Sequence, residues 1–253
     1  MEDWRLLDLE FTDAPSNLAL EEVIARRVGE GKSPPTLRLW RNRNAAVIGE
    51  NQSASAELRL DACREYGIEV VRRFTGGGAV YHDLGNLNYS ICVRKPPSSS
   101  LELQQAVFRQ GLDCAFASLG IMGLESSRAP INTIMVRGRK IVGGAGAIRW
   151  GAVFYHGSIL VSTDLEMVWR ILRWEPLPTQ PVLVQSIRLP VTSLNAELGR
   201  EIPIERVKVA LKDAFTRTLE THLVPSPPTE QELEIVPVLV KEKYGTEEWN
   251  FKM

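Results

Sequence analysis

Three strand-like runs in the middle of the chain lie so close together that no helix fits between them. They cover residues 131–136, 140–148 and 153–161, and each is rich in apolar or small residues. Parallel neighbours need a crossover of roughly a dozen residues, whereas antiparallel neighbours are joined by short turns. The spacing therefore predicts an antiparallel sheet in this part of the chain.

Other strand-like runs alternate with amphipathic segments. Further strands are expected at residues 5–9, 36–41, 45–48, 68–71, 79–81 and 87–93. Ser16 is expected to cap a helix that continues to Arg27, and Ser55 to open a helix that ends at Gly67. A long helix is expected over 101–119. This order favours an α/β fold of the α+β kind, a mixed and largely antiparallel sheet with packed helices.

The C-terminal third is mainly helical in pattern. Asp164 is expected to cap a short helix that ends at Leu172, and residues 204–223 show apolar positions on one helical face. A last helical pattern covers 229–244. Pro237 interrupts it, so we expect a kink or a break there.

Charge and cysteine content exclude several classes of protein. The chain has 253 residues, with 30 basic and 31 acidic side chains, so no net field attracts nucleic acid or an anionic membrane. It shows no signal-peptide pattern and no apolar run long enough for a bilayer. Cys63, Cys92 and Cys114 form no CxxC pair, which indicates reduced thiols, a cytoplasmic location and no bound metal.

A glycine-rich segment carries the strongest signal for a binding site. Residues 72–86 place three consecutive glycines between an arginine pair and a His-Asp pair. Without Cβ atoms, the backbone N–H groups can approach an anion, and Arg73 can pair with a phosphate or carboxylate. Neither a Walker A loop nor a GxGxxG turn before a helix is present. On the glycines alone, a tight hairpin turn is an equally good interpretation.

A second segment places a lysine beside small residues. Lys140 follows a predicted turn with Gly138 at its tip, and Gly143, Gly144 and Ala145 leave room for a ligand. A lone lysine at the start of a strand is usually a solvated end. The small residues that follow make this one a candidate for the site.

Several segments together resemble one known family. Residues 72–90 read RRFTGGGAVYHDLGNLNYS, followed by GRKIVG at 138–143, HGSIL at 156–160 and KYGTEEWN at 243–250. This succession is similar to lipoate-protein ligases, and its last part to the archaeal members. The resemblance implies a fold shared with biotin protein ligases and related to class II tRNA synthetases. It also implies that 1–253 form a single catalytic domain, with the helices of 204–253 as part of it and no accessory domain.

The resemblance implies an adenylation followed by an acyl transfer. Lipoate and ATP, with Mg²⁺, would form lipoyl-AMP, and the acyl group would pass to a lysine of an acceptor. The implied acceptors are the lipoyl domains of 2-oxoacid dehydrogenase E2 subunits and the glycine cleavage H protein. A separate small accessory protein is an implied partner, in place of the domain that longer ligases carry. Neither nucleic acid nor a membrane is an expected partner.

The resemblance also implies roles for individual residues. Lys140 corresponds to the family's lysine and is the expected catalytic residue, since its charge would stabilise oxygens in both steps. The expected contacts to ATP and lipoyl-AMP are Arg73, Gly76, Gly77, Gly78, Ala79, Val80, Tyr81, His82, Asp83, Asn132, Lys140, Gly143, Gly144 and Ala145. The expected contacts to lipoate are Lys140, Gly76, Gly77, His156 and Ser158. For His82 and Asp83, bracing of a turn is an equally good interpretation.

The chain departs from the family pattern at Thr133, where many members have an aspartate after the asparagine. The alternatives therefore stay open. An octanoyltransferase on the same fold would need a nucleophilic thiol, yet 123–129 contains serines and no cysteine. A biotin protein ligase would carry a GRGRxGR-type loop, which is absent. A paralogue that binds lipoate or a lipoyl domain without catalysis would release no pyrophosphate.

Overall fold

The computed structural model describes residues 2–96, 100–175 and 186–252. The strands of its main sheet are β1 (Glu2–Asp8), β2 (Thr36–Trp40), β6 (Asn86–Arg94), β7 (Ser127–Ala129), β8 (Thr133–Val136), β9 (Arg139–Arg149), β10 (Ala152–Leu160) and β11 (Thr221–Pro225). They are ordered β11-β1-β2-β6-β10-β9-β8-β7. Strand β1 is parallel to β11 and β2, and every other neighbouring pair is antiparallel. The predicted mixed, largely antiparallel sheet is confirmed.

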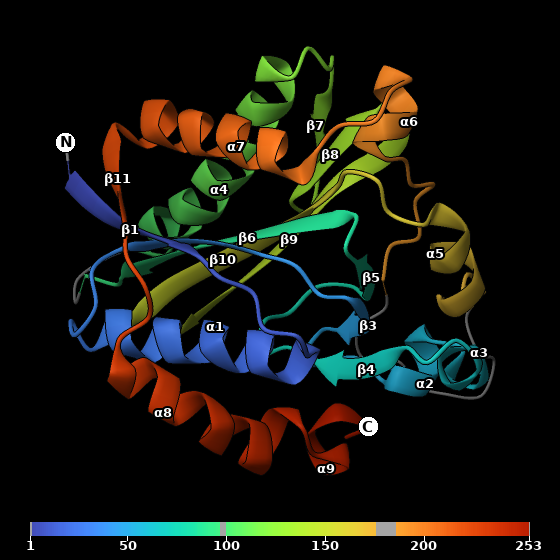
Figure 1. The fold of residues 1–253 in the computed structure, drawn as a ribbon, viewed down its shortest axis with the longest axis horizontal. Coiled ribbons are helices and arrows are strands. Elements are labelled where there is room, and N and C mark those ends of the chain that lie inside the picture. The colour runs from blue at the N-terminus through green and yellow to red at the C-terminus, as the bar shows by residue number, and fades with distance from the viewer. Residues whose placement is uncertain (1, 97–99, 176–185, 253) are drawn as a thin grey trace.

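A small second sheet lies beyond one end of the main strands (Figure 1). It contains β3 (Asn44–Ile48), β4 (Glu69–Arg72) and β5 (Val80–Asp83), with β3 in the middle. Strand β3 is parallel to β4 and antiparallel to β5. The glycine-rich segment connects β4 to β5, so it spans two strands that do not pair with each other.

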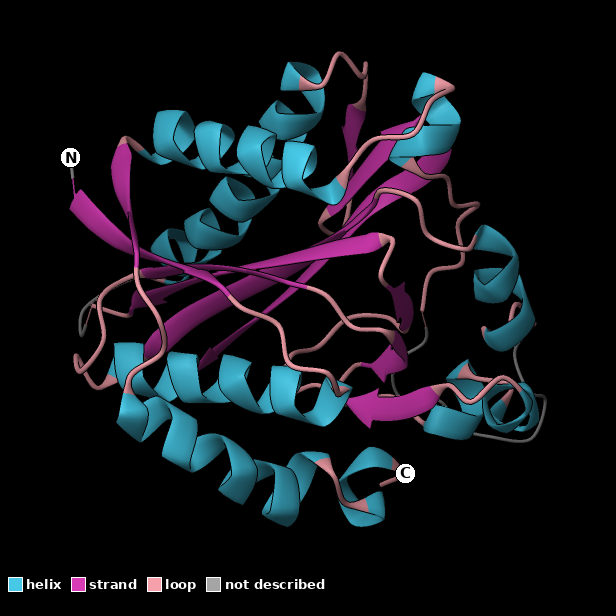
Figure 2. Cartoon of the chain, viewed as in Figure 1, coloured by secondary structure: helices cyan, strands magenta, loops and turns pink. Residues whose placement is uncertain are grey.

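Helices cover both faces of the main sheet (Figure 2). Helices α4 (Leu101–Ile121) and α7 (Ile204–Leu219) lie on one face, and α1 (Ala14–Gly29) lies on the other with α8 (Glu230–Leu239) outside it. Strand β6 shows why both faces are buried. Its Leu87, Tyr89 and Ile91 belong to the core under α4 and α7, whereas Cys92 packs in the core under α1.

Two predicted helix starts were wrong in detail. Helix α1 begins at Ala14, with Asp13 as the cap that accepts the Ser16 N–H and a proline in the first turn, where no donor is lost. The helix expected from Ser55 is divided into α2 (Ala54–Glu57) and α3 (Leu60–Glu65). Leu58 between them is extended and forms a β-bridge with Leu172. The stop at Gly67 is confirmed, with φ at +60°.

The C-terminal predictions were correct in part. Asp164 caps α5 (Leu165–Ile171) as expected, but the helix from Ile204 ends at Leu219 and the chain then forms β11. Helix α8 continues through Pro237 to Leu239, so the chain is not broken at the proline. The π-helical segment η1 (Val240–Tyr244) follows directly. Helices α6 (Leu194–Leu198) and α9 (Glu247–Asn250) complete the order. No helix within the described residues is long and apolar enough to span a membrane.

Candidate active site

A cavity of about 540 Å³ lies between the main sheet and the small sheet, on the side of α1. Most of the expected site residues line it: Arg73, Gly77, Gly78, Ala79, Val80, Tyr81, His82, Lys140, Gly143, Gly144, Ala145, His156 and Ser158. Three expected contacts, Gly76, Asp83 and Asn132, are not among its lining residues. Its size and largely apolar wall suit a small organic ligand.

Arg73 holds the glycine-rich loop in shape. Its side chain is 4% exposed, and Nη2 donates to the carbonyls of Gly76 at 2.6 Å and Gly78 at 2.8 Å. Nη1 donates to the carbonyl of Val47 at 3.2 Å. Burial lowers the pKa of Arg73 to about 10, although the charges of Glu21 and Glu57 oppose that shift. The guanidinium is therefore charged at neutral pH, and it binds the loop where the sequence suggested a ligand anion.

Thr75 and His156 extend the hydrogen-bond network of Arg73. The Thr75 hydroxyl accepts from Arg73 Nε at 3.0 Å and forms a second hydrogen bond with His156 Nε2 at 2.8 Å. His156 Nδ1 then donates to Glu21 Oε2 at 2.8 Å. Sequence reasoning missed Glu21 and Thr75. A signal existed for Glu21, since it is an acidic residue in the middle of the apolar part of α1.

Lys140 carries an ammonium group that has no counter-ion among the described residues. Its backbone N–H donates to the carbonyl of Pro190 at 2.7 Å, and its carbonyl accepts from Thr192 at 2.9 Å. The side chain folds over Gly143, where a Cβ would lie 2.6 Å from Nζ. Within the described residues no carboxylate lies in ion-pair range of Nζ. Burial, followed by the charges of Arg73 and Arg188, lowers the pKa of Lys140.

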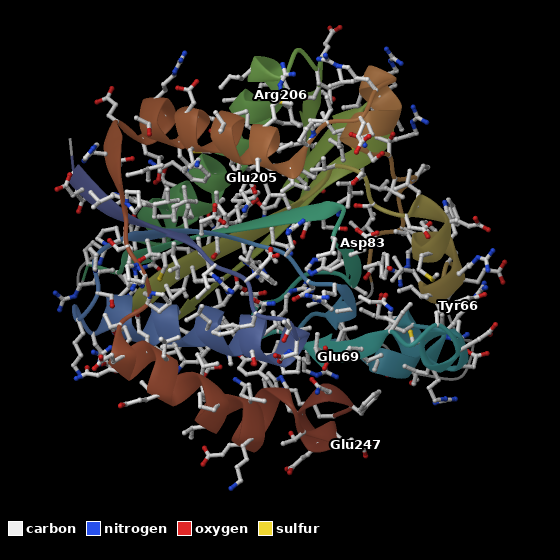
Figure 3. The ribbon with its side chains drawn as sticks, in the orientation of Figure 1. Tyr66, Glu69, Asp83, Glu205, Arg206 and Glu247 are labelled. Carbon is white, nitrogen blue, oxygen red and sulfur yellow. The ribbon has the colours of Figure 1, made fainter. Side chains whose placement is uncertain are left out.

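His82 and Asp83 are consecutive in the chain, but only His82 borders the cavity. His82 Nε2 approaches Ser158 Oγ at 3.0 Å in the cavity wall, and burial lowers the pKa of His82 to about 3. The ring is therefore neutral. Asp83 lies where β5 faces α5 (Figure 3), and its carboxylate accepts from the N–H groups of Gly85 and Asp164, both at 2.8 Å. This geometry fits the turn-bracing interpretation of Asp83.

Thr133 lies in the cavity wall, and no acidic side chain is among the described residues of that wall. Ile131 and Asn132 have φ values of 60° and 52°, so the predicted strand begins only at Thr133. The carbonyl of Asn132 accepts from the Gly144 N–H at 2.9 Å. No aspartate or glutamate is among the described lining residues, and the described residues contain no acidic cluster that could hold a metal ion.

A segment that sequence reasoning missed closes one side of the cavity. Ser186 Oγ accepts from the Ala79 N–H at 2.7 Å and donates to Glu57 Oε2 at 2.6 Å. Glu57 is 1% exposed and forms an ion pair with Arg188. Ser186, Ile187, Arg188 and Leu189 all line the cavity, so this segment packs on the glycine-rich loop. These four residues form no sequence motif that indicates a ligand site.

All three cysteines of the chain are described, and none lines the cavity. Burial raises the pKa of Cys63 to about 11 and that of Cys114 to about 12. It also raises the pKa of Cys92, which faces α1. A thiol becomes a nucleophile only when it ionises, so these three are structural.

The site combines a small-molecule cavity, a glycine-rich loop shaped by a buried arginine, and a lysine ammonium that no described carboxylate neutralises. A model of the lipoyl protein ligase A/B catalytic domain matches residues 13–216. The chain therefore belongs to the lipoyl protein ligase A/B family, and it is an enzyme family that attaches lipoyl or octanoyl groups to proteins.

Relatives of both activities are similar to the chain over almost its full length. The lipoate-protein ligase A subunit 1 of Thermoplasma acidophilum is 36% identical, over 97% of this chain and 95% of the relative. The octanoyltransferase LipM of Symbiobacterium thermophilum is 33% identical, over 99% of this chain and 98% of the relative. Sequence similarity therefore does not choose between a ligase and a transferase.

Solved structures show the same fold. The T. acidophilum ligase with bound lipoic acid has a TM-score of 0.83 at 35% identity, covering 99% of this chain and 100% of that chain. A lipoate-protein ligase A bound with ATP has a TM-score of 0.84 at 34% identity, covering 99% of both chains. A bi-partite ligase of T. acidophilum, studied with its E2 lipoyl domain, has a TM-score of 0.84 at 33% identity, covering 99% of this chain and 96% of that chain.

Proposed function

We propose that this chain activates lipoate with ATP and transfers the lipoyl group to a lysine of an acceptor protein. The observation that carries the proposal is the Lys140 ammonium, which lies at the cavity without a counter-ion among the described residues. Such a charge remains available to oxygens that become negative during a reaction. In the ligase reaction, both steps place negative charge on oxygens next to the acyl carbon.

In the first step, a lipoate carboxylate oxygen attacks the α-phosphorus of ATP, and pyrophosphate leaves. Lys140 would contact the carboxylate and the α-phosphate, and backbone N–H groups of the loop from Gly77 to Tyr81 would hold the nucleotide. Arg73 would keep that loop in place through the carbonyls it already binds. Nucleotide binding by this loop requires Ser186 to release the Ala79 N–H, to which it is now bonded.

In the second step, the acceptor lysine attacks the acyl carbon of lipoyl-AMP, an amide forms, and AMP leaves with one of the former carboxylate oxygens. Lys140 would stabilise the developing oxyanion. The acceptors we propose are E2 lipoyl domains or H protein. Because a similar ligase is bi-partite, we also propose that a separate small protein completes adenylation.

The octanoyltransferase alternative needs a thiol that can carry the acyl group. Cys63, Cys92 and Cys114 are buried outside the cavity, and the pKa of each is raised. No thioester can form there without moving a cysteine into the cavity, so the geometry favours the ligase.

The test is release of pyrophosphate from Mg-ATP by the purified chain, with lipoate as the second substrate. Assays with and without the candidate small partner and a lipoyl-domain acceptor separate adenylation from transfer. We expect release that depends on lipoate and increases with the partner. Acyl transfer from octanoyl carrier protein without ATP, together with no release, would contradict the ligase and support the transferase. Lipoate binding without release or transfer would support the non-catalytic paralogue.

A further inference from the structure

Five residues that line the cavity lie in one straight row across the main sheet. Thr133 on β8 pairs with Gly143 on β9, and Gly143 pairs with Ser158 on β10. Ser158 pairs with Asn88 on β6, and Asn88 pairs with Trp40 on β2. Directly paired residues of antiparallel strands project to the same face. The row therefore lies on one face of the main sheet, and each of its residues borders the cavity.

The side-chain amide of Asn88 on this row is only partly paired within the described structure. Its side chain is 1% exposed, and its Oδ1 accepts from the Ser158 hydroxyl. Its Nδ2 is buried and has no hydrogen-bond partner among the described residues. A buried amide donor is costly when it stays unpaired, so it favours any ligand atom that accepts from it.

A chain of hydrogen bonds leads from Arg38 to the hydroxyl that this amide contacts. A guanidinium can only donate, so Asn17 presents Oδ1 to Arg38 Nη2 at 2.8 Å. Asn17 must then donate from Nδ2 to Asn42 Oδ1, at 2.9 Å. Asn42 in turn donates from Nδ2 to His82 Nδ1, at 3.1 Å. The orientation of each amide follows from the one before it.

The same chain continues from His82 to the cavity. Since His82 Nδ1 accepts and the ring is neutral, the proton is on Nε2 and is donated to Ser158 Oγ at 3.0 Å. The Ser158 hydroxyl donates to Asn88 Oδ1. In this arrangement the Oδ1 of Asn88 accepts from Ser158, and its NH₂ group makes no hydrogen bond to that hydroxyl.

The position of Asn88 along the row indicates which part of a ligand it meets. The Lys140 ammonium lies over Gly143, and Asn88 is two strands further on, roughly 10 Å at the usual spacing between strands. An extended eight-carbon acyl chain spans roughly 9 Å, by analogy with the reach of a stretched polypeptide. With its carboxylate at Lys140, such an acid places its far end near Asn88. The indole Nε1 of Trp40, one strand beyond, also lacks a partner within the described part of the chain.

We propose that Asn88 selects the acyl substrate by donating from Nδ2 to an acceptor atom near the far end of the acyl chain. The proposal rests on the proposed function and deepens it. The dithiolane of lipoate carries sulfur atoms that accept weakly, whereas the end of octanoate has no acceptor and leaves the amide unpaired. A site built around a donor discriminates against an analogue that lacks the acceptor. The cavity therefore prefers lipoate to octanoate.

The test compares calorimetric binding of free lipoate and free octanoate, which requires no ATP and no catalysis. We expect wild-type protein to bind lipoate more tightly, and Asn88→Leu to lower the lipoate-to-octanoate preference roughly 3- to 10-fold. Asn88→Asp keeps the oxygen that accepts from Ser158 and lacks the amide donor, so it should lower the preference too. Ser90→Ala, on the same strand face but outside the cavity lining, is the matched control and should leave it unchanged.

Two results would overturn the inference while leaving the proposed function intact. One is an unchanged preference in both Asn88 variants, with binding of both acids retained. The other is an equal fall of the lipoate-to-octanoate preference in the Ser90→Ala control, because any substitution on this face of β6 would then have the same effect. If wild-type protein bound neither acid and released no pyrophosphate, the proposed function would fail, and this inference with it.

Discussion

Lys140 combines a catalytic position with an energetic disadvantage. Its ammonium is largely buried, the positive charges of Arg73 and Arg188 repel it, and no described carboxylate pairs with it. A buried charge without a partner destabilises a fold, and such residues persist mainly where chemistry requires them. The same charge is what makes the residue useful to a phosphate or an oxyanion. At this site, activity and stability should therefore respond to substitution in opposite directions.

Lys140→Met keeps the length of the side chain and removes the charge. We expect lipoate-dependent acyl transfer to fall by roughly 10²-fold or more, because one preorganised cation is lost. We expect the free energy of unfolding to rise by about 1 kcal/mol, since the unpaired charge is gone. Steady-state transfer assays and urea unfolding measure both. Near-normal transfer would remove Lys140 from the mechanism.

The pKa of Lys140 also gives a pH dependence of stability. Because the folded pKa lies below the ordinary value of 10.5, the unfolded chain holds the proton more tightly. As pH rises from the folded pKa towards 10.5, stability gains relative to Lys140→Met, whose side chain does not titrate. Urea unfolding of the wild type and of Lys140→Met between neutral pH and pH 10.5 measures this difference in the free energy of unfolding. A difference that is constant with pH would contradict the lowered pKa.

At the scale of elements, the glycine-rich loop depends on one conformation that only glycine adopts easily. Gly77 has a φ of +85°, and a Cβ there would lie 3.1 Å from both Ala145 Cβ and Arg73 Nη2. Gly76 has open space around it and an ordinary φ. The three glycines that look equivalent in the sequence are therefore unequal in the fold.

We expect Gly77→Ala to cost about 1–2 kcal/mol of unfolding free energy, from the unfavourable φ and the close contacts, and to weaken nucleotide binding. Gly76→Ala should leave the unfolding free energy within about 0.5 kcal/mol of wild type, and is the matched control for stability. Thermal or urea unfolding compares them. Equal effects of the two substitutions would show that the loop conformation is not the constraint.

Local sequence signals predicted the elements whose contacts are local. The stop at Gly67, the cap at Asp164 and the hairpin before Lys140 follow from residue types within a few positions. The signals failed where distant partners decide. Residues 221–225 form a strand only because β1 offers an edge, and Leu58 is extended because Leu172 pairs with it. Such partners are invisible in a local pattern.

The candidate site was predicted to a similar extent. The motif predicted the loop and Lys140. The partners of Arg73 are backbone carbonyls, which every residue carries, so residue types could not predict them. Ser186 approaches the loop from 107 positions along the chain, and Glu57 joins it from α2. Their place at the cavity depends on tertiary packing, which a single sequence does not reveal.

Over the whole molecule, one buried arginine joins the end of the described chain to the neighbourhood of the cavity. Arg72 is fully buried, and its guanidinium donates to the carbonyls of Trp249, Asn250 and Lys252 and to that of Gly49. Gly49 in turn packs against the carbonyl of Gly77, where a Cβ would lie 2.2 Å away. Arg72 and Gly49 therefore connect α9 to the glycine-rich loop through direct contacts.

Replacing Arg72 with lysine keeps the charge but loses the planar fork that reaches these separate carbonyls. We expect Arg72→Lys to lower the free energy of unfolding by about 2–3 kcal/mol. The matched control is Arg64→Lys, at an exposed position on α3, which should change it by less than about 0.5 kcal/mol. Urea unfolding of both variants tests this. A negligible loss in Arg72→Lys would show that the link is dispensable.

The central claim is that the lipoate carboxylate is activated by forming a bond to the α-phosphorus of ATP. The most direct measurement uses lipoate labelled with ¹⁸O in its carboxylate, Mg-ATP, an acceptor domain and the small partner, with mass spectrometry of the AMP produced. The account predicts AMP that carries one ¹⁸O atom for each lysine modified, because the adenylate leaves with a carboxylate oxygen. Modified acceptor together with unlabelled AMP, or with no AMP, would contradict it.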